Sequence, residues 1–175
     1  MNNFNFIDKI NIESLKNKIK LFNKEKWDEF DFRQKSFEVH KKTRTIPLIF
    51  DTDFRMENPT YLKDYSLFSE ELNSCEKILH NFYGKGFLIR AILVSLKARC
   101  NIDPHVDGGN SLEKCFRVHL PIITNDKVKF TVGGETKIFQ EGELWEINNS
   151  GKLHSVENHS DEDRIHLILD WITQQ

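Results

Sequence analysis

The chain has 175 residues, of which 30% are charged, and its formal net charge at pH 7 is -2. This length fits one domain with a substantial core and no need of disulfides. The near-neutral balance leaves no basic surface of the kind that nucleic acids bind, and no apolar run is long enough to cross a membrane. We therefore expect neither a nucleic-acid nor a membrane partner.

The cysteines and the first residues indicate the compartment. Cys75, Cys100 and Cys115 show neither the spacing of a disulfide framework nor the close pairing of zinc ligands. Residues 1–5 are mostly polar and contain neither a basic stretch nor the apolar stretch of a secretory signal. These features predict a cytoplasmic protein.

The first half of the chain, residues 1–86, mixes helical and extended patterns. An apolar residue recurs every three or four positions from 12 to 22, which predicts an amphipathic helix. Residues 46–50 predict a short strand. Residues 69–82 have one apolar stripe and predict a second helix, which Gly84 ends. We expect both helices to cover the core.

Short strands dominate residues 87–175. Six segments either alternate polar and apolar residues or are continuously apolar: 87–96, 116–124, 128–132, 136–139, 144–147 and 164–172. Gly133-Gly134 predicts a tight hairpin between two of them. Many short strands separated by turns favour a β-sandwich or jelly roll. We expect residues 1–86 to pack on residues 87–175, so that the two parts form one compact domain.

Two histidines and a carboxylate form a candidate metal site. His105 and Asp107 share one side of an extended segment, because side chains alternate there. His154 follows a turn at 148–151 and begins another extended segment. This ligand set, with open coordination positions, is that of non-haem Fe(II) oxygenases. The spacing alone does not show that a metal binds here, because such a His-x-Asp pair also occurs in proteins without a metal.

A charged residue in an apolar strand supports the metal hypothesis. Arg164 lies ten positions after His154, and burying its guanidinium is costly unless an anion pairs with it. A dicarboxylate cosubstrate would supply that anion. Arg117 and His119 share one face of another apolar strand. The pattern leaves open whether that face points to solvent or into a pocket.

The remaining candidates concern the surroundings of this site. We expect the loop 108–114 to lie at the mouth of a pocket, where loops often select substrates. His40, His80 and His159 have polar neighbours, and we interpret them as surface groups.

Five motifs follow one another between Arg90 and Trp171. They are Pro104-His105-Val106-Asp107, Arg117-Val118-His119-Leu120-Pro121, Gly142-Glu143-Leu144-Trp145, His154-Ser155-Val156-Glu157-Asn158 and Arg164-Ile165-His166-Leu167-Ile168-Leu169-Asp170. Together they resemble the aspartyl/asparaginyl beta-hydroxylase family of Fe(II)- and 2-oxoglutarate-dependent dioxygenases. They are also similar to bacterial free-proline hydroxylases, which have an aspartate at the position of Asp107, whereas animal members of the family have glycine there.

The resemblance implies a mainly β fold, a double-stranded β-helix of the cupin-like jelly-roll type, with N-terminal covering helices. It implies catalytic Fe(II) held by His105, Asp107 and His154. It further implies 2-oxoglutarate bound by Arg164, with help from Arg117 and His119, and O2 as the second cosubstrate.

These features predict a hydroxylase that acts on an amino acid, free or within a peptide or protein. The short loops of a chain of this length favour a small amino acid or a short peptide. Two other functions stay open: a non-catalytic jelly-roll module that binds a metal or ligand, and a metal-dependent cupin isomerase or sensor. The joint presence of the three metal-ligand candidates and Arg164 favours the enzyme.

Overall fold

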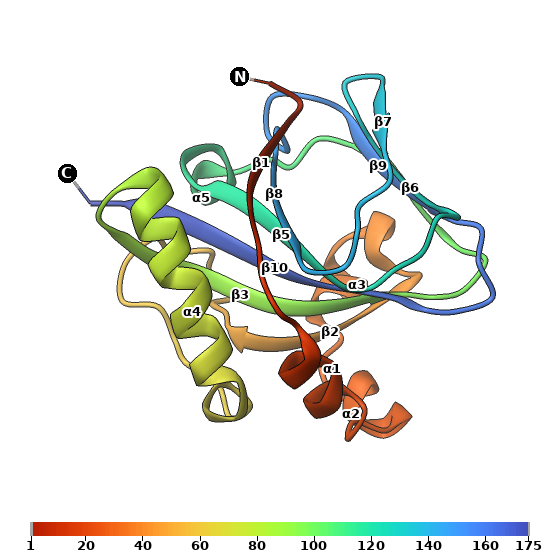
Figure 1. The fold of residues 1–175 in the computed structure, drawn as a ribbon, viewed down its shortest axis with the longest axis horizontal. Coiled ribbons are helices and arrows are strands. Elements are labelled where there is room, and N and C mark those ends of the chain that lie inside the picture. The colour runs from red at the N-terminus through yellow and green to blue at the C-terminus, as the bar shows by residue number, and fades with distance from the viewer. Residues whose placement is uncertain (1, 175) are drawn as a thin grey trace.

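The structure, a computed structural model, describes residues 2–174, and its strands form two antiparallel sheets (Figure 1). The larger sheet has the order β1 (Phe4–Lys9), β8 (Glu143–Ile147), β5 (Phe116–Ile123), β10 (Arg164–Thr173), β3 (Gly86–Leu96), β2 (Thr43–Ile49). The smaller sheet has the order β4 (Asn101–His105), β9 (His154–Asn158), β6 (Val128–Val132), β7 (Glu135–Lys137). The predicted jelly roll is confirmed.

Helices accompany the N-terminal half of the chain. They are α1 (Glu13–Ile19), α2 (Lys24–Asp28), α3 (Phe32–Ser36), the 3-10 turn η1 (Glu38–His40), α4 (Tyr65–Tyr83) and, further on, α5 (Asn110–Lys114). Both predicted helices are present as α1 and α4. α4 ends at Gly84, whose φ of 92° is a backbone conformation that glycine adopts at little cost. Figure 1 shows α4 lying across the outer face of the larger sheet.

The central strands of the larger sheet are covered on both faces, which explains their nearly continuous apolar sequences. On the outer face, Leu93 of β3 and Leu167 and Leu169 of β10 belong to the main core, together with Leu72 and Leu79 of α4. All five side chains are almost completely buried. The outer face therefore anchors the covering helices.

The inner face of the same sheet carries the charged residues. In β10 these are Arg164, His166 and Asp170, and in β5 they are Arg117 and His119; all five are buried. The His119 ring lies 5.1 Å from the ring of Phe130 in β6 of the smaller sheet. The sequence did not decide whether the face with Arg117 and His119 points to solvent or into a pocket. In the structure it points inward, into the space between the two sheets.

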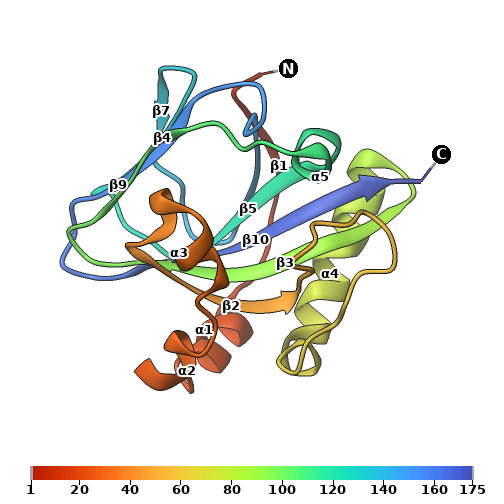
Figure 2. The ribbon, with the colours of Figure 1, turned by 180° about the vertical axis from the view of Figure 1, so that it is seen from behind.

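Residues 1–86 contribute to the same sheet as residues 87–175. β1 and β2 form the two edges of the larger sheet, and the α3 segment lies at the open side between β2 and β4 (Figure 2). We infer that the two parts form one domain; residues 1 and 175 lie outside the described range.

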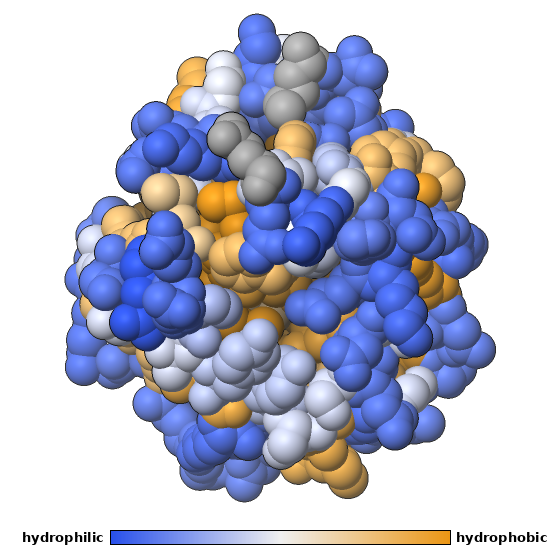
Figure 3. Space-filling view, turned by 90° about the vertical axis from the view of Figure 1, so that its left-hand side faces the viewer, coloured by the Kyte–Doolittle hydropathy of each residue, from blue (hydrophilic) through white to orange (hydrophobic). Residues whose placement is uncertain are grey.

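The surface is consistent with the charged composition. The face in Figure 3 is mostly hydrophilic, with smaller hydrophobic areas between the polar groups. Among residues 2–174, no helix combines the length and the apolar character that crossing a membrane requires.

Candidate metal centre

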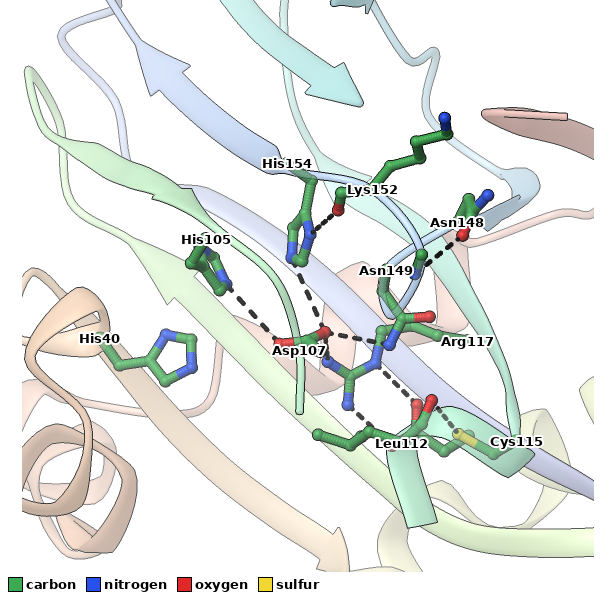
Figure 4. A network of polar contacts seen from close by, with 12 residues as sticks. His40, His105, Asp107, Leu112, Cys115, Arg117, Asn148, Asn149, Lys152 and His154 are labelled. Atoms are coloured by element: carbon green, nitrogen blue, oxygen red, sulfur yellow. Dashed lines mark hydrogen bonds and ion pairs between the residues drawn. The ribbon is translucent and has the colours of Figure 1, made fainter. Parts of the chain in front are cut away.

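The pairing of two strands brings the candidate ligands together. In the register of β4 with β9, His105 lies opposite His154, and their ring centroids are 4.2 Å apart. Asp107 follows β4, and its backbone N–H donates to the Asn149 carbonyl at 3.0 Å, which turns the chain toward the histidines. Possible ligand atoms of the three residues all lie within 4.8 Å of one another (Figure 4).

Backbone carbonyls orient both imidazoles. Nδ1 of His105 is 2.8 Å from the Asp103 carbonyl, and Nδ1 of His154 is 3.4 Å from the Lys152 carbonyl. Because a carbonyl only accepts, each Nδ1 carries the proton, and Nε2 of the neutral ring keeps a free lone pair. Each Nε2 lies 3.7 Å from an oxygen of Asp107. These distances are somewhat longer than the roughly 3 Å between adjacent ligands around a small octahedral cation.

The carboxylate of Asp107 is held on one side only. Arg117 Nη1 and Asn149 Nδ2 both donate to Oδ2, the latter at 3.1 Å, which leaves Oδ1 available to a cation. Burial alone would raise the pKa of Asp107, but the charge of Arg117 lowers it below its ordinary value. The group is therefore an ionised acceptor at neutral pH.

A second carboxylate fixes the arginine behind Asp107. The fully buried Asp170 accepts hydrogen bonds at 2.8 Å from both Nε and Nη2 of Arg117. It also pairs with Arg90, whose guanidinium lies 5.2 Å from the centre of the Phe54 ring. All three nitrogens of Arg117 are thus engaged, and its side chain is a rigid support for Asp107.

Arg164 is a buried guanidinium that has no counterion within residues 2–174. It is only 2% exposed, and its Nε has no hydrogen-bond partner among residues 2–174. Burial lowers its pKa to about 9, and no neighbouring carboxylate opposes that shift. Such a group requires an anion to offset its desolvation.

His119 and His166 lie beside this arginine. Their Nδ1 atoms are 3.3 Å apart, and Nε2 of each ring has no partner in the described part of the chain. Burial and the charge of Arg164 lower the pKa of both rings well below the ordinary value, so both are neutral.

Two connected cavities meet at the metal-ligand candidates. The larger has a volume of about 680 Å³, and the inner one, about 40 Å³, is lined by Arg164 and His119. Both are lined by His105, Asp107 and Arg117. Residues 108–112 form one wall of the larger cavity, where the sequence predicted a pocket mouth, although residues 110–114 form α5 rather than a loop.

The interpretation of His40 as a surface group is wrong. Its Nε2 is 2.9 Å from Nη2 of Arg33, and its ring centroid is 5.9 Å from that of His105. Figure 4 shows His40 on the N-terminal segment, turned toward the triad. Burial and the charge of Arg33 lower its pKa to about 2. Its polar neighbours in sequence gave no sign that η1 folds back onto β4.

The two buried histidines beside Arg164 predict a pH-dependent stability. His119 and His166 remain neutral when folded, whereas in the unfolded chain they take up protons below their ordinary pKa. The unfolded state therefore binds more protons as the pH falls. We expect the free energy of unfolding of the metal-free protein to drop by about 2 kcal/mol per histidine between about pH 7 and pH 5. Urea unfolding at both pH values measures this; an equal or higher stability at the lower pH would contradict it.

Comparisons with known proteins identify the family. The Aspartyl/Asparaginyl beta-hydroxylase family matches residues 6–174. No curated protein sequence matches the chain.

Among solved structures, a prolyl hydroxylase from Trichoplax adhaerens, in complex with a hypoxia inducible factor peptide fragment, has a TM-score of 0.63 at 11% identity. This likeness covers 98% of this chain and 84% of that one. An oxidoreductase of the 2OG-Fe(II) oxygenase family from Burkholderia pseudomallei has a TM-score of 0.59 at 16% identity, over 74% and 67% of the two chains. A prolyl-4-hydroxylase from Pseudomonas putida has a TM-score of 0.57 at 8% identity, over 99% and 94%. At these identities the likeness shows a common fold. With the match over nearly the whole chain and the His-Asp-His triad, the chain belongs to the aspartyl/asparaginyl beta-hydroxylase family and is a 2-oxoglutarate-dependent hydroxylase.

Proposed function

We propose that Fe(II) is held by His105, Asp107 and His154, and that the protein hydroxylates an amino acid, free or within a peptide or protein. The donor set fits Fe(II): two imidazole nitrogens with free lone pairs and one ionised carboxylate oxygen lie at the meeting point of two cavities. Three protein ligands leave coordination positions for small molecules.

The observation that carries the proposal is the unpaired Arg164 in the inner cavity, beside the triad. 2-Oxoglutarate has a carboxylate at each end, so one end can neutralise Arg164 while the keto-acid end reaches the metal. His119 lines the same cavity and offers a ring nitrogen without a partner. Arg117 also lines it, and we propose that it assists mainly by holding Asp107 in place.

Iron together with 2-oxoglutarate and O2 supplies oxidising power: the overall reaction gives succinate, carbon dioxide and a substrate in which C–H has become C–OH. The protein residues orient and protect the reactants. Arg164 fixes the cosubstrate, the Arg117–Asp107 pair fixes one metal ligand, and the inner cavity with its apolar Val94, Phe130 and Ile168 limits access of water.

The larger cavity is the proposed substrate site. Its volume of about 680 Å³ falls within the range of pockets that enclose small organic ligands, which suits an amino acid or short peptide. A non-catalytic binding module would not require a triad and an unpaired arginine that line the same cavity.

The test is turnover with a panel of free amino acids and short peptides, in the presence of Fe(II), 2-oxoglutarate and air. We expect succinate formation that depends on one class of substrate, and a product heavier by one oxygen atom. Omission of iron is the control. No succinate with any of these substrates, from protein shown to contain iron, would contradict the proposed substrate class.

A further inference from the structure

Four buried arginines surround the two cavities, and they differ in their partners. Arg90 and Arg117 are paired with Asp170, and Arg117 also with Asp107. Arg164 and Arg33 make no ion pair with a carboxylate in the described chain. The proposed cosubstrate accounts for Arg164. Arg33 remains without an assigned anion.

Arg33 is built into the wall of the larger cavity. It belongs to the short helix α3 and is only 8% exposed. Nη1 donates to Thr45 Oγ1 at 3.3 Å, and Nη2 lies 2.9 Å from His40 Nε2. Both partners are neutral acceptors, so they orient the guanidinium without cancelling its charge. Burial and the nearby Arg117 lower the pKa of Arg33 to about 9, as expected for a cation that lacks a counterion.

The charge balance points to a substrate that carries a carboxylate. A divalent cation and doubly charged 2-oxoglutarate would cancel each other, and the four arginines would still face only Asp107 and Asp170. Arg33 lines both the larger cavity and the inner one, so an anion bound to it would lie next to the metal-ligand candidates. A guanidinium binds a carboxylate through two parallel hydrogen bonds.

One part of the wall of the larger cavity is aromatic, beside polar residues such as Asp53 and Asn110. Phe37, Phe50 and Phe54 line the larger cavity, and the Phe54 ring lies 6.1 Å from Phe37 and 6.0 Å from Phe50. Phe37 is partly exposed and extends the apolar surface to the rim. These three rings stabilise an apolar group packed against them through the apolar area that it buries.

We propose that the substrate is a carboxylic acid with an apolar body larger than the proline ring, such as an amino acid with a large apolar side chain or a dipeptide that ends in one. Arg33 binds its carboxylate, and the phenylalanine wall holds its apolar body. This inference rests on the proposed function, because it assigns the substrate of the same site.

The first test compares acids, on the wild-type protein, with the corresponding amides, in which an uncharged group replaces the carboxylate. Calorimetric titration is done without oxygen, with Fe(II) and 2-oxoglutarate present, so that binding is measured without turnover. L-Phenylalanine and glycyl-L-phenylalanine are expected to bind about ten- to a hundredfold more tightly than their amides, and more tightly than L-proline or L-aspartate. If neither acid binds, if the amides bind equally well, or if L-proline or L-aspartate binds best, the proposal is overturned.

The second test asks whether Arg33 is the residue that binds the carboxylate. Arg33→Gln should weaken binding of the acids about ten- to a hundredfold and leave the amides unchanged, and Arg33→Lys should restore part of the loss. If Arg33 had only a structural role, its replacement would weaken the binding of acids and amides equally. Arg99→Gln, at an exposed arginine paired with Asp161, is the matched control and should change neither.

The outcomes separate this inference from the proposed function. Unchanged acid binding in Arg33→Gln would overturn the role of Arg33. Failure of the wild-type protein to bind 2-oxoglutarate in the same titrations would instead contradict the proposed function. If Arg33→Gln does not fold, the comparison of acids with amides on the wild-type protein still decides whether a carboxylate is recognised.

Discussion

Replacement of His154 by alanine is expected to abolish Fe(II) binding and turnover while the protein stays folded. The change removes one of three proposed ligands, and two ligands bind a divalent ion far more weakly. The fold should survive, because β9 is held by backbone pairing with β4 and β6 on its two sides. Metal analysis after Fe(II) loading measures the effect, and circular dichroism reports the fold.

His159→Ala is the matched control, since this histidine is exposed and lies just after the same strand. It should leave iron content unchanged. His105→Ala should behave like His154→Ala. Full iron occupancy in the His154→Ala protein would show that the metal binds elsewhere than at the triad.

Replacement of Arg164 should separate cosubstrate binding from metal binding. Arg164→Ala leaves a buried carboxylate of 2-oxoglutarate without its partner, so we expect affinity to fall about a hundredfold or more. Arg164→Lys keeps the charge but loses the two-pronged geometry, and a loss of about ten- to a hundredfold is expected. Iron binding should change little, because Arg164 is not a ligand candidate.

Titration with 2-oxoglutarate in the presence of Fe(II) measures both variants. Arg99→Lys provides a control at an exposed arginine. Wild-type affinity in Arg164→Ala would mean that the cosubstrate carboxylate binds elsewhere.

Most of the jelly roll could be predicted from the sequence, because its central strands are continuously apolar and glycines mark several turns. The elements that escaped prediction are β1, α2, α3, η1 and α5. Each is short, and segments of this length are stabilised by tertiary packing more than by their own sequence. β4 and β9 were anticipated only as the extended segments that carry His105 and His154.

His105 and Asp107 could be predicted as a pair because two possible ligands are separated by one residue. Arg164 could be predicted because it is a charged residue in an apolar strand. The same signal was present for Arg90 and Asp170, which lie in apolar strands and form the ion-pair network behind Asp107. Arg33 and His40 gave no such signal, since both lie in a polar stretch. Only the folding of α3 and η1 against β2 and β4 brings them to the cavity.

The central claim is that the triad binds Fe(II) in a way that lets 2-oxoglutarate chelate it. A keto acid bound through both donor atoms to Fe(II) gives a visible charge-transfer absorption, so anaerobic titration of the iron-loaded protein with 2-oxoglutarate tests this directly. We expect a saturable visible band in the wild-type protein, no band in His154→Ala, and a titration shifted to higher cosubstrate concentration in Arg164→Lys. An iron-loaded wild-type protein that binds 2-oxoglutarate without such a band would contradict it.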